Sequence, residues 1–190
     1  MKPDRLNAFT DGVIAIIITI MVLEMRVPEG TGVAALRPMV PIFGAYILSF
    51  IYVGIYWNNH HHMMQTAKRV DGRVLWSNLG LLFWLSLFPF VIRWIDERGV
   101  TSFPVAAFGV VLTMASISYL VLEKALIAAE GESSGVAEAV GSRMKEWLSF
   151  ILYVVGSVAA FLVSPWLSIA LYMAVAVIWL VPDRRFERKQ

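Results

Sequence analysis

The sequence predicts an all-α, polytopic membrane protein with six transmembrane helices in one domain spanning residues 1–190. Composition is the first reason, because 58% of the residues are hydrophobic and only 16% are charged. The mean hydropathy of +0.69 lies outside the range of soluble domains. The second reason is that the charged residues divide the chain into uncharged apolar runs. Their lengths are close to the ~20 residues that a helix needs to cross a bilayer. The absence of cysteine excludes disulfide frameworks and thiolate metal sites.

Each segment is bounded by charges or by helix-breaking residues. The first ends at Pro28, followed by Gly30 and Gly32. The stretch from Trp147 to Pro182 has no charged residue and is too long for one helix, so we expect a break at Ser164-Pro165. The predicted helices cover approximately residues 6–27, 38–59, 74–93, 100–122, 147–164 and 166–182.

Lysine and arginine are unevenly distributed between the two sides that six helices create. Most lie at the two chain ends and in the loops after the second and fourth segments. The positive-inside rule therefore predicts a plasma-membrane protein with both termini in the cytoplasm. Because topology accounts for these charges, the pI near 9.0 does not indicate nucleic-acid binding.

The first segment carries two carboxylates, Asp11 and Glu24, only thirteen residues apart. Along a helix this is roughly 20 Å, shorter than the ~30 Å hydrocarbon layer. An ionised carboxylate that faces lipid costs a few kcal/mol. We therefore expect this helix to face the bundle interior or water, in a central position.

On a helical wheel, Gly12, Ile16, Ile20 and Leu23 form one stripe, with Thr19 on its flank. Buried apolar packing explains such a stripe in most single helices. If several copies met around an axis, the same residues would form stacked rings. Apolar rings close a narrow conduit by dewetting, and hydroxyl rings replace part of an ion's hydration shell. Periodicity alone leaves both interpretations open.

The stretch RLNAFTDGVIAIIITIMVLEM resembles the R-x-x-x-F-S-D signature and first helix of the transmembrane protein 175 family of bacterial and lysosomal cation channels. Arg5, Phe9, Thr10 and Asp11 occupy the motif, with Thr10 where serine is usual. The stretches YWNNHHH, which contains Trp57, and NLGLLFWLSLFPF also fit the family. The second half of the chain adds only length and hydrophobicity.

The resemblance implies a K⁺-permeable homotetramer whose pore is lined by the first helix, without the filter loop of ordinary K⁺ channels. It implies the narrowest hydrophobic constriction at Ile16, further apolar constrictions at Ile20 and Leu23, and a selectivity role for Thr19. The expected partners are K⁺, the lipid bilayer and copies of the same chain, with no cofactor and no metal.

Other polar residues are candidates for supporting roles. We expect Arg5 and Asp11 to anchor the first helix through hydrogen bonds to neighbouring helices. His60 matches the family position three residues after Trp57, and we expect it to bond near the cytoplasmic end of that helix, with Asn78 in the same network. Glu24 would concentrate cations at the outer mouth, although an ordinary helix-end charge explains it equally well.

Two alternatives remain open beside the channel. A proton-coupled secondary transporter would use Asp11 or His60 as a proton relay, although no inverted repeat supports it. A non-conducting membrane scaffold would bury the first helix as simple packing. The run from His60 to His62 does not predict a metal site, because consecutive helical residues point about 100° apart. No catalytic motif indicates an enzyme.

Overall fold

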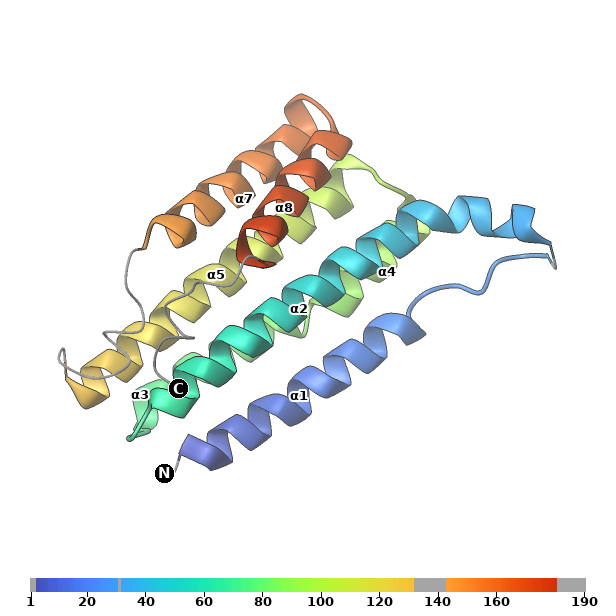
Figure 1. The fold of residues 1–190 in the computed structure, drawn as a ribbon. Helices are drawn as coiled ribbons and strands as arrows, with labels where there is room; N and C mark the ends of the chain where they lie inside the picture. Colours follow the sequence, from blue (N-terminus) through green and yellow to red (C-terminus); the bar gives the residue numbers. More distant parts are fainter. Residues whose placement is uncertain (1–2, 31, 132–142, 181–190) are drawn as a thin grey trace.

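The computed structural model describes residues 3–30, 32–131 and 143–180, and the regular structure within them is helical. The helices lie side by side as an elongated bundle, with α1 at one edge and α7 and α8 at the other (Figure 1). The elements are α1 Pro3–Leu23, η1 Val33–Met39, α2 Val40–Thr66, α3 Gly72–Leu85, α4 Phe88–Arg98, α5 Ser102–Glu130, α7 Met144–Leu162 and α8 Pro165–Leu180. The predicted all-α class is confirmed.

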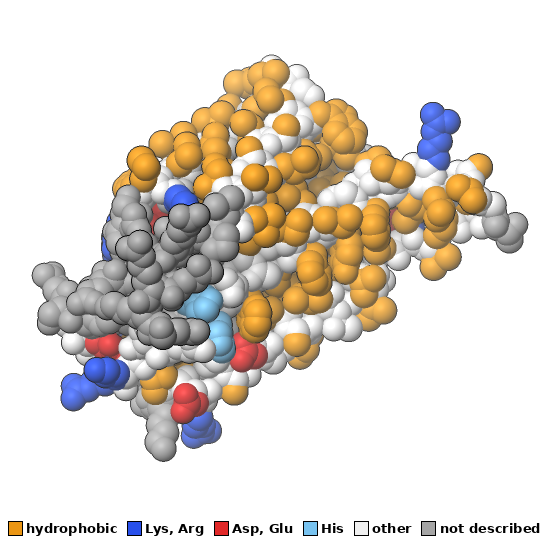
Figure 2. All heavy atoms as spheres, in the orientation of Figure 1, with side chains coloured by type: hydrophobic (Ala, Val, Ile, Leu, Met, Phe, Trp, Pro, Cys, Tyr) orange, Lys and Arg blue, Asp and Glu red, His pale blue; other side chains and the backbone are white. Residues whose placement is uncertain are grey.

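The described helices have the length and polarity of a membrane domain. Five stretches are long and apolar enough to span a bilayer: Pro3–Leu23, Val33–Thr66, Gly72–Arg98, Ser102–Glu130 and Met144–Leu162. The sixth, α8, is a shorter apolar helix of 16 residues, about 24 Å long. In Figure 2 hydrophobic side chains cover the middle of the visible face, whereas charged side chains lie toward its ends. Residues 181–182 of the predicted sixth segment, and the basic residues beyond them, lie outside the described residues.

Three helix ends differ from their predicted positions. Helix α1 ends at Leu23 rather than near Val27, so Glu24 follows the helix. Helix α2 continues to Thr66, which places the YWNNHHH stretch inside the helix rather than at its end. Helix α5 continues to Glu130, well beyond the predicted end at residue 122. The second and fourth segments were predicted to end where their apolar runs end. A helix can continue past that point into water, because its backbone hydrogen bonds remain satisfied there.

The predicted third segment, 74–93, is not one helix but two, α3 and α4, separated at Ser86–Leu87. Pro89 lies in the first turn of α4. Proline has no N–H and its ring clashes with the preceding turn, so a helix cannot continue unbroken through it. The hydroxyl of Ser86 donates to the carbonyl of Phe83 at 2.7 Å and satisfies part of the interrupted backbone. The break redirects α4 along the later half of α1.

Helices α2, α5, α7 and α8 pack around a set of aromatic rings. Tyr52 donates a hydrogen bond to the backbone carbonyl of Tyr172 at 2.7 Å. The ring of Phe108 meets the rings of Tyr52 and Tyr172 edge-on, at 6.4 and 5.7 Å between centroids. Gly109 and Gly156 leave the space that the Tyr172 side chain fills, because a Cβ at either position would collide with it. These four helices form one closely packed block.

Helix α1 lies outside that block and packs against α2, α3 and α4 on one side only. The expectation of a central first helix is therefore wrong within a single chain (Figure 1). The expectation rested on Asp11 and Glu24. Both carboxylates have polar partners from neighbouring helices, so α1 does not need to be enclosed. Its opposite side is left without cover from the described residues.

Candidate ion pathway

Helix α1 has one buried and one exposed face. The buried face carries residues spaced three or four apart: Leu6, Thr10, Ile14, Ile17 and Met21. The exposed face includes the predicted stripe, with Ile16 60% and Leu23 74% exposed. Six exposed residues of α1 follow one another at alternating intervals of four and three positions: Arg5, Phe9, Gly12, Ile16, Thr19 and Leu23. Ile20 lies beside them on the same face. Ile16, Thr19, Ile20 and Leu23 are thus all exposed in the single chain, although Ile16 and Ile20 also line a groove beside α4.

The Thr19 hydroxyl has a fixed orientation on the exposed face. It donates to the carbonyl of Ala15, one turn earlier, at 2.8 Å. A hydroxyl has one donor and two acceptor lone pairs, so this bond uses the proton and leaves oxygen lone pairs available. An oxygen presented in this way can accept a hydrogen bond or coordinate a cation.

The buried face of α1 is held by a polar chain of three side chains, all 0% exposed: Thr10, Asn78 and His60. The Asn78 amide donates to the Thr10 hydroxyl at 2.9 Å. The Asn78 carbonyl oxygen lies 2.8 Å from His60 Nε2, which donates because a carbonyl oxygen can only accept. The chain therefore ties α1 to α2 and α3. Threonine at position 10 supplies the same hydroxyl that serine would.

Asp11 forms a second connection between α1 and α2. Trp57 Nε1 donates to its carboxylate at 2.8 Å, and Asn7 donates to the other oxygen at 3.4 Å. The Trp57 indole stacks on His61 with centroids 5.7 Å apart. Asp11 thus contacts a neighbouring helix. Arg5 is exposed, and no hydrogen bond or ion pair of its side chain is recorded within the described part of the chain.

The other end of α1 is joined to α4 by ion pairs. Arg93 binds Glu24 at 3.0 Å and Glu97 at 3.0 Å. Asp96 accepts a bond from the Arg26 backbone at 3.2 Å and lies 3.4 Å from the Arg26 guanidinium. Glu24, expected as a free carboxylate at a mouth, is therefore paired. Sequence reasoning missed the role of Arg93, because 69 residues separate it from Glu24.

A groove of about 420 Å³ runs along the exposed face of α1. Ile16 and Ile20 line one wall, while Pro89 and Phe90 line the other. The Glu24–Arg93 ion pair lies at one end of this groove. The break between α3 and α4 thus lies directly beside the residues that were expected to form the narrowest ring.

The histidine run points in different directions. His60 bonds to Asn78, whereas His61 contacts Asn7 at 3.4 Å and Gln65 at 2.8 Å. Within residues 3–30, 32–131 and 143–180, no group of three or more histidine, cysteine or acidic side chains is arranged to hold a metal ion. The conformation therefore offers hydrogen-bonding groups here rather than a ligand set.

Comparison with known proteins identifies the family. Residues 5–89 match the family described as "Endosomal/lysosomal potassium channel TMEM175". A protein of Chryseobacterium sp. (strain P1-3), named a potassium channel, is 54% identical over 188 residues, which cover 99% of this chain and 97% of that protein. This chain belongs to the TMEM175 family.

Other comparisons extend the relationship to TMEM175 structures. The crystal structure of a lysosomal potassium-selective channel TMEM175 homolog from Chamaesiphon minutus covers 94% of this chain and 96% of its own. The TM-score is 0.81 at 25% identity. A potassium channel of Streptomyces collinus is 30% identical over 126 residues, 62% of this chain and 61% of that protein. The TMEM175 fold thus includes the second half of the chain, where no motif was found. These relatives are named channels rather than enzymes.

We expect Asn78→Leu to destabilise this TMEM175 family protein by about 1–2 kcal/mol. A hydrogen bond within a membrane domain contributes ~0.6 kcal/mol on average, and the stranded groups of Thr10 and His60 add a desolvation cost. Thermal unfolding of the purified protein in detergent measures the effect. Asn58→Leu, an exposed amide on α2, is the matched control. Equal melting temperatures for the two variants would contradict the anchoring role.

Proposed function

We propose that this chain is a homotetrameric, K⁺-permeable cation channel of the plasma membrane, with both termini in the cytoplasm. Four copies of α1 surround a central axis, and ions pass down their gradient between them. The observation that carries the proposal is the exposed face of α1. It leaves Gly12, Ile16, Thr19, Ile20 and Leu23 exposed while polar bonds hold the opposite face.

The exposed residues form one continuous strip along α1, which is the surface that lengthwise contact between copies of the helix would need. The names of the relatives from Chryseobacterium and Streptomyces, both called potassium channels, support K⁺ as the permeant ion.

In the tetramer the exposed aliphatic side chains form the hydrophobic gate. Ile16, Ile20 and Leu23 lie about one helical turn apart, so their rings stack over about 10 Å. A narrow conduit lined by such rings loses its water, and an ion then cannot enter. Widening the rings admits water and ions together. Ile16 forms the narrowest ring in this proposal.

Thr19 lies between the Ile16 and Leu23 rings and supplies four oxygens to the conduit. Because each hydroxyl proton is held by Ala15, the lone pairs face the ion. These oxygens replace part of the hydration shell of K⁺ more favourably than that of the more strongly hydrated Na⁺. Glu24 stands at the outer mouth, where Arg93 offsets its charge.

The deciding experiment measures stoichiometry and flux on the same purified protein. We expect a tetramer in detergent, and K⁺ efflux from liposomes calibrated with valinomycin. A protein that forms no tetramer and passes no K⁺ would favour the membrane scaffold. Saturable flux driven by a proton gradient would favour the secondary transporter.

We expect Ile16→Asn to increase K⁺ flux by roughly tenfold, because an amide ring holds water where the aliphatic ring excludes it. Liposome efflux measures the change. Val22→Asn is the matched control, since Val22 is apolar and 45% exposed but lies off the stripe. If both variants conduct like the unmodified protein, the constriction is not at Ile16.

We expect Thr19→Val to lower the K⁺/Na⁺ permeability ratio by up to about tenfold. This corresponds to ~1.4 kcal/mol, the scale of one net hydrogen bond. Valine keeps the shape and removes the oxygen. Reversal potentials in mixed K⁺ and Na⁺ solutions measure the ratio, and Thr19→Ser, which restores a hydroxyl, should retain it. An unchanged reversal potential for Thr19→Val would remove Thr19 from the selectivity mechanism.

We expect Arg93→Gln to raise cation conductance at low ionic strength, because the Glu24 carboxylate loses its partner and attracts cations. The Debye length falls from ~30 Å at 0.01 M to ~3 Å at 1 M salt, so the effect should vanish at high salt. Single-channel recording across this range tests it. Arg98→Gln removes an exposed arginine of the same helix without freeing Glu24. Equal effects of the two variants would show that only net charge matters.

A further inference from the structure

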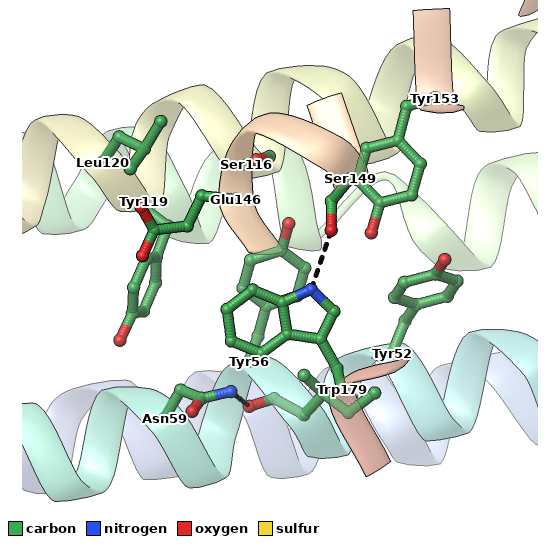
Figure 3. A pocket seen from close by; sticks show the side chains of 11 residues that line it. Tyr52, Tyr56, Asn59, Ser116, Tyr119, Leu120, Glu146, Ser149, Tyr153 and Trp179 are labelled. Atoms are coloured by element: carbon green, nitrogen blue, oxygen red, sulfur yellow. Dashed lines mark hydrogen bonds between the residues drawn. The ribbon is translucent and has the colours of Figure 1, made fainter. Parts of the chain in front are cut away.

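A second cavity lies away from the exposed face of α1, inside the block of α2, α5, α7 and α8 (Figure 3). Its volume is about 40 Å³. One water molecule needs roughly 10–15 Å³ by the same measure, so the cavity has room for two or three non-hydrogen atoms. The walls combine aromatic rings with one carboxylate, Glu146.

The rings form two pairs across the cavity. Tyr52 and Tyr153 meet edge-on with centroids 6.0 Å apart, and Tyr56 and Tyr119 lie 6.1 Å apart. Trp179 lies between the two pairs (Figure 3). Its indole N–H donates to the Ser149 hydroxyl at 2.8 Å, which fixes the ring position. The cavity is therefore lined by π faces and edges that are already held in place.

Glu146 supplies the charge. It lies in the first turn of α7, where the helix dipole favours a negative side chain. Its Oε2 atom is shielded from solvent and has no hydrogen-bond partner among the described residues. The nearby guanidinium of Arg143 is bonded to a different carboxylate, that of Glu123, at 2.8 Å. A shielded carboxylate oxygen without a partner favours a cation beside it.

We propose that this cavity is a binding site for a small organic ammonium ion, of the size of methylammonium, separate from the ion pathway. The ammonium group pairs with Glu146 Oε2, and the methyl group packs against the tyrosine and tryptophan rings. Aromatic faces attract cations through their quadrupole, and alkylated ammonium ions suit such cages because their surface is partly apolar.

The same walls are poorly suited to a bare metal cation, which needs several oxygen ligands. The Ser149 hydroxyl already donates to the Lys145 carbonyl at 2.7 Å and accepts from Trp179. The Asn59 amide nitrogen donates to the carbonyl of Ile55 at 2.9 Å. Among the described lining residues, Glu146 is the one charged group in a wall that is mainly aromatic, which suits an organic cation better than a strongly hydrated metal cation.

Methylammonium binding to the purified full-length protein in detergent tests the proposal. Saturation-transfer NMR follows the methyl protons at constant ionic strength. We expect saturable binding that Glu146→Gln weakens at least about tenfold, the equivalent of ~1.4 kcal/mol. Ser116→Leu, which keeps the carboxylate but fills the cavity, should abolish the same signal. Glu29→Gln, an exposed carboxylate, should bind like the unmodified protein.

Two further compounds test which chemical class of ligand the cavity binds. Methanol has the size of methylammonium but no charge, and it should give no saturable signal. K⁺ at equal concentration should leave methylammonium bound. Binding that survives both Glu146→Gln and Ser116→Leu, or displacement by equimolar K⁺, would overturn the proposal. Because K⁺ flux is not the measurement, this outcome does not depend on whether the protein conducts.

Discussion

The polar chain from Thr10 through Asn78 to His60 fixes how the first helix is turned, and the rest of the structure depends on it. Inside a bilayer these groups find no water, so they must be satisfied by one another. One rotation of α1 brings the Thr10 hydroxyl to Asn78, and that rotation directs Ile16 outward. Turning the helix by a single residue would break the bond and misplace the whole exposed stripe. A buried hydrogen bond thus determines which face of α1 is exposed.

The two ends of α1 are held by interactions of different strength. At one end the bonds are buried, and losing one leaves polar groups stranded. At the other end Arg93 is largely exposed, and surface ion pairs of this kind contribute only about 0–1 kcal/mol each. The groove and the break before α4 adjoin this weaker end. The end of α1 near Thr10 is thus held by buried hydrogen bonds, whereas the end near Glu24 is held by ion pairs whose arginines are exposed.

The sequence predicted the all-α membrane class and the approximate spans, because charges and apolar runs are local signals, but the helical repeat did not decide whether the stripe of α1 is buried or exposed. It did not predict the division of the third span, since Pro89 lies within an unbroken apolar run that satisfied the length criterion. It also missed the Glu24–Arg93 pair, which depends on how distant segments pack. The grouping of His60 with Asn78 came from the family resemblance, since no local pattern joins the two positions. Within one chain α1 lies at the edge of the bundle, because the described residues cover only one of its sides.

The tight fit of Tyr172 into the space left by Gly109 and Gly156 is a constraint that no sequence motif marks. The family model matches residues 5–89, whereas the fold shared with the Chamaesiphon minutus protein extends over 94% of the chain. Shape alone therefore carries part of the architecture of the second half. A methyl group at either glycine would collide with the Tyr172 ring and force α5, α7 and α8 to repack.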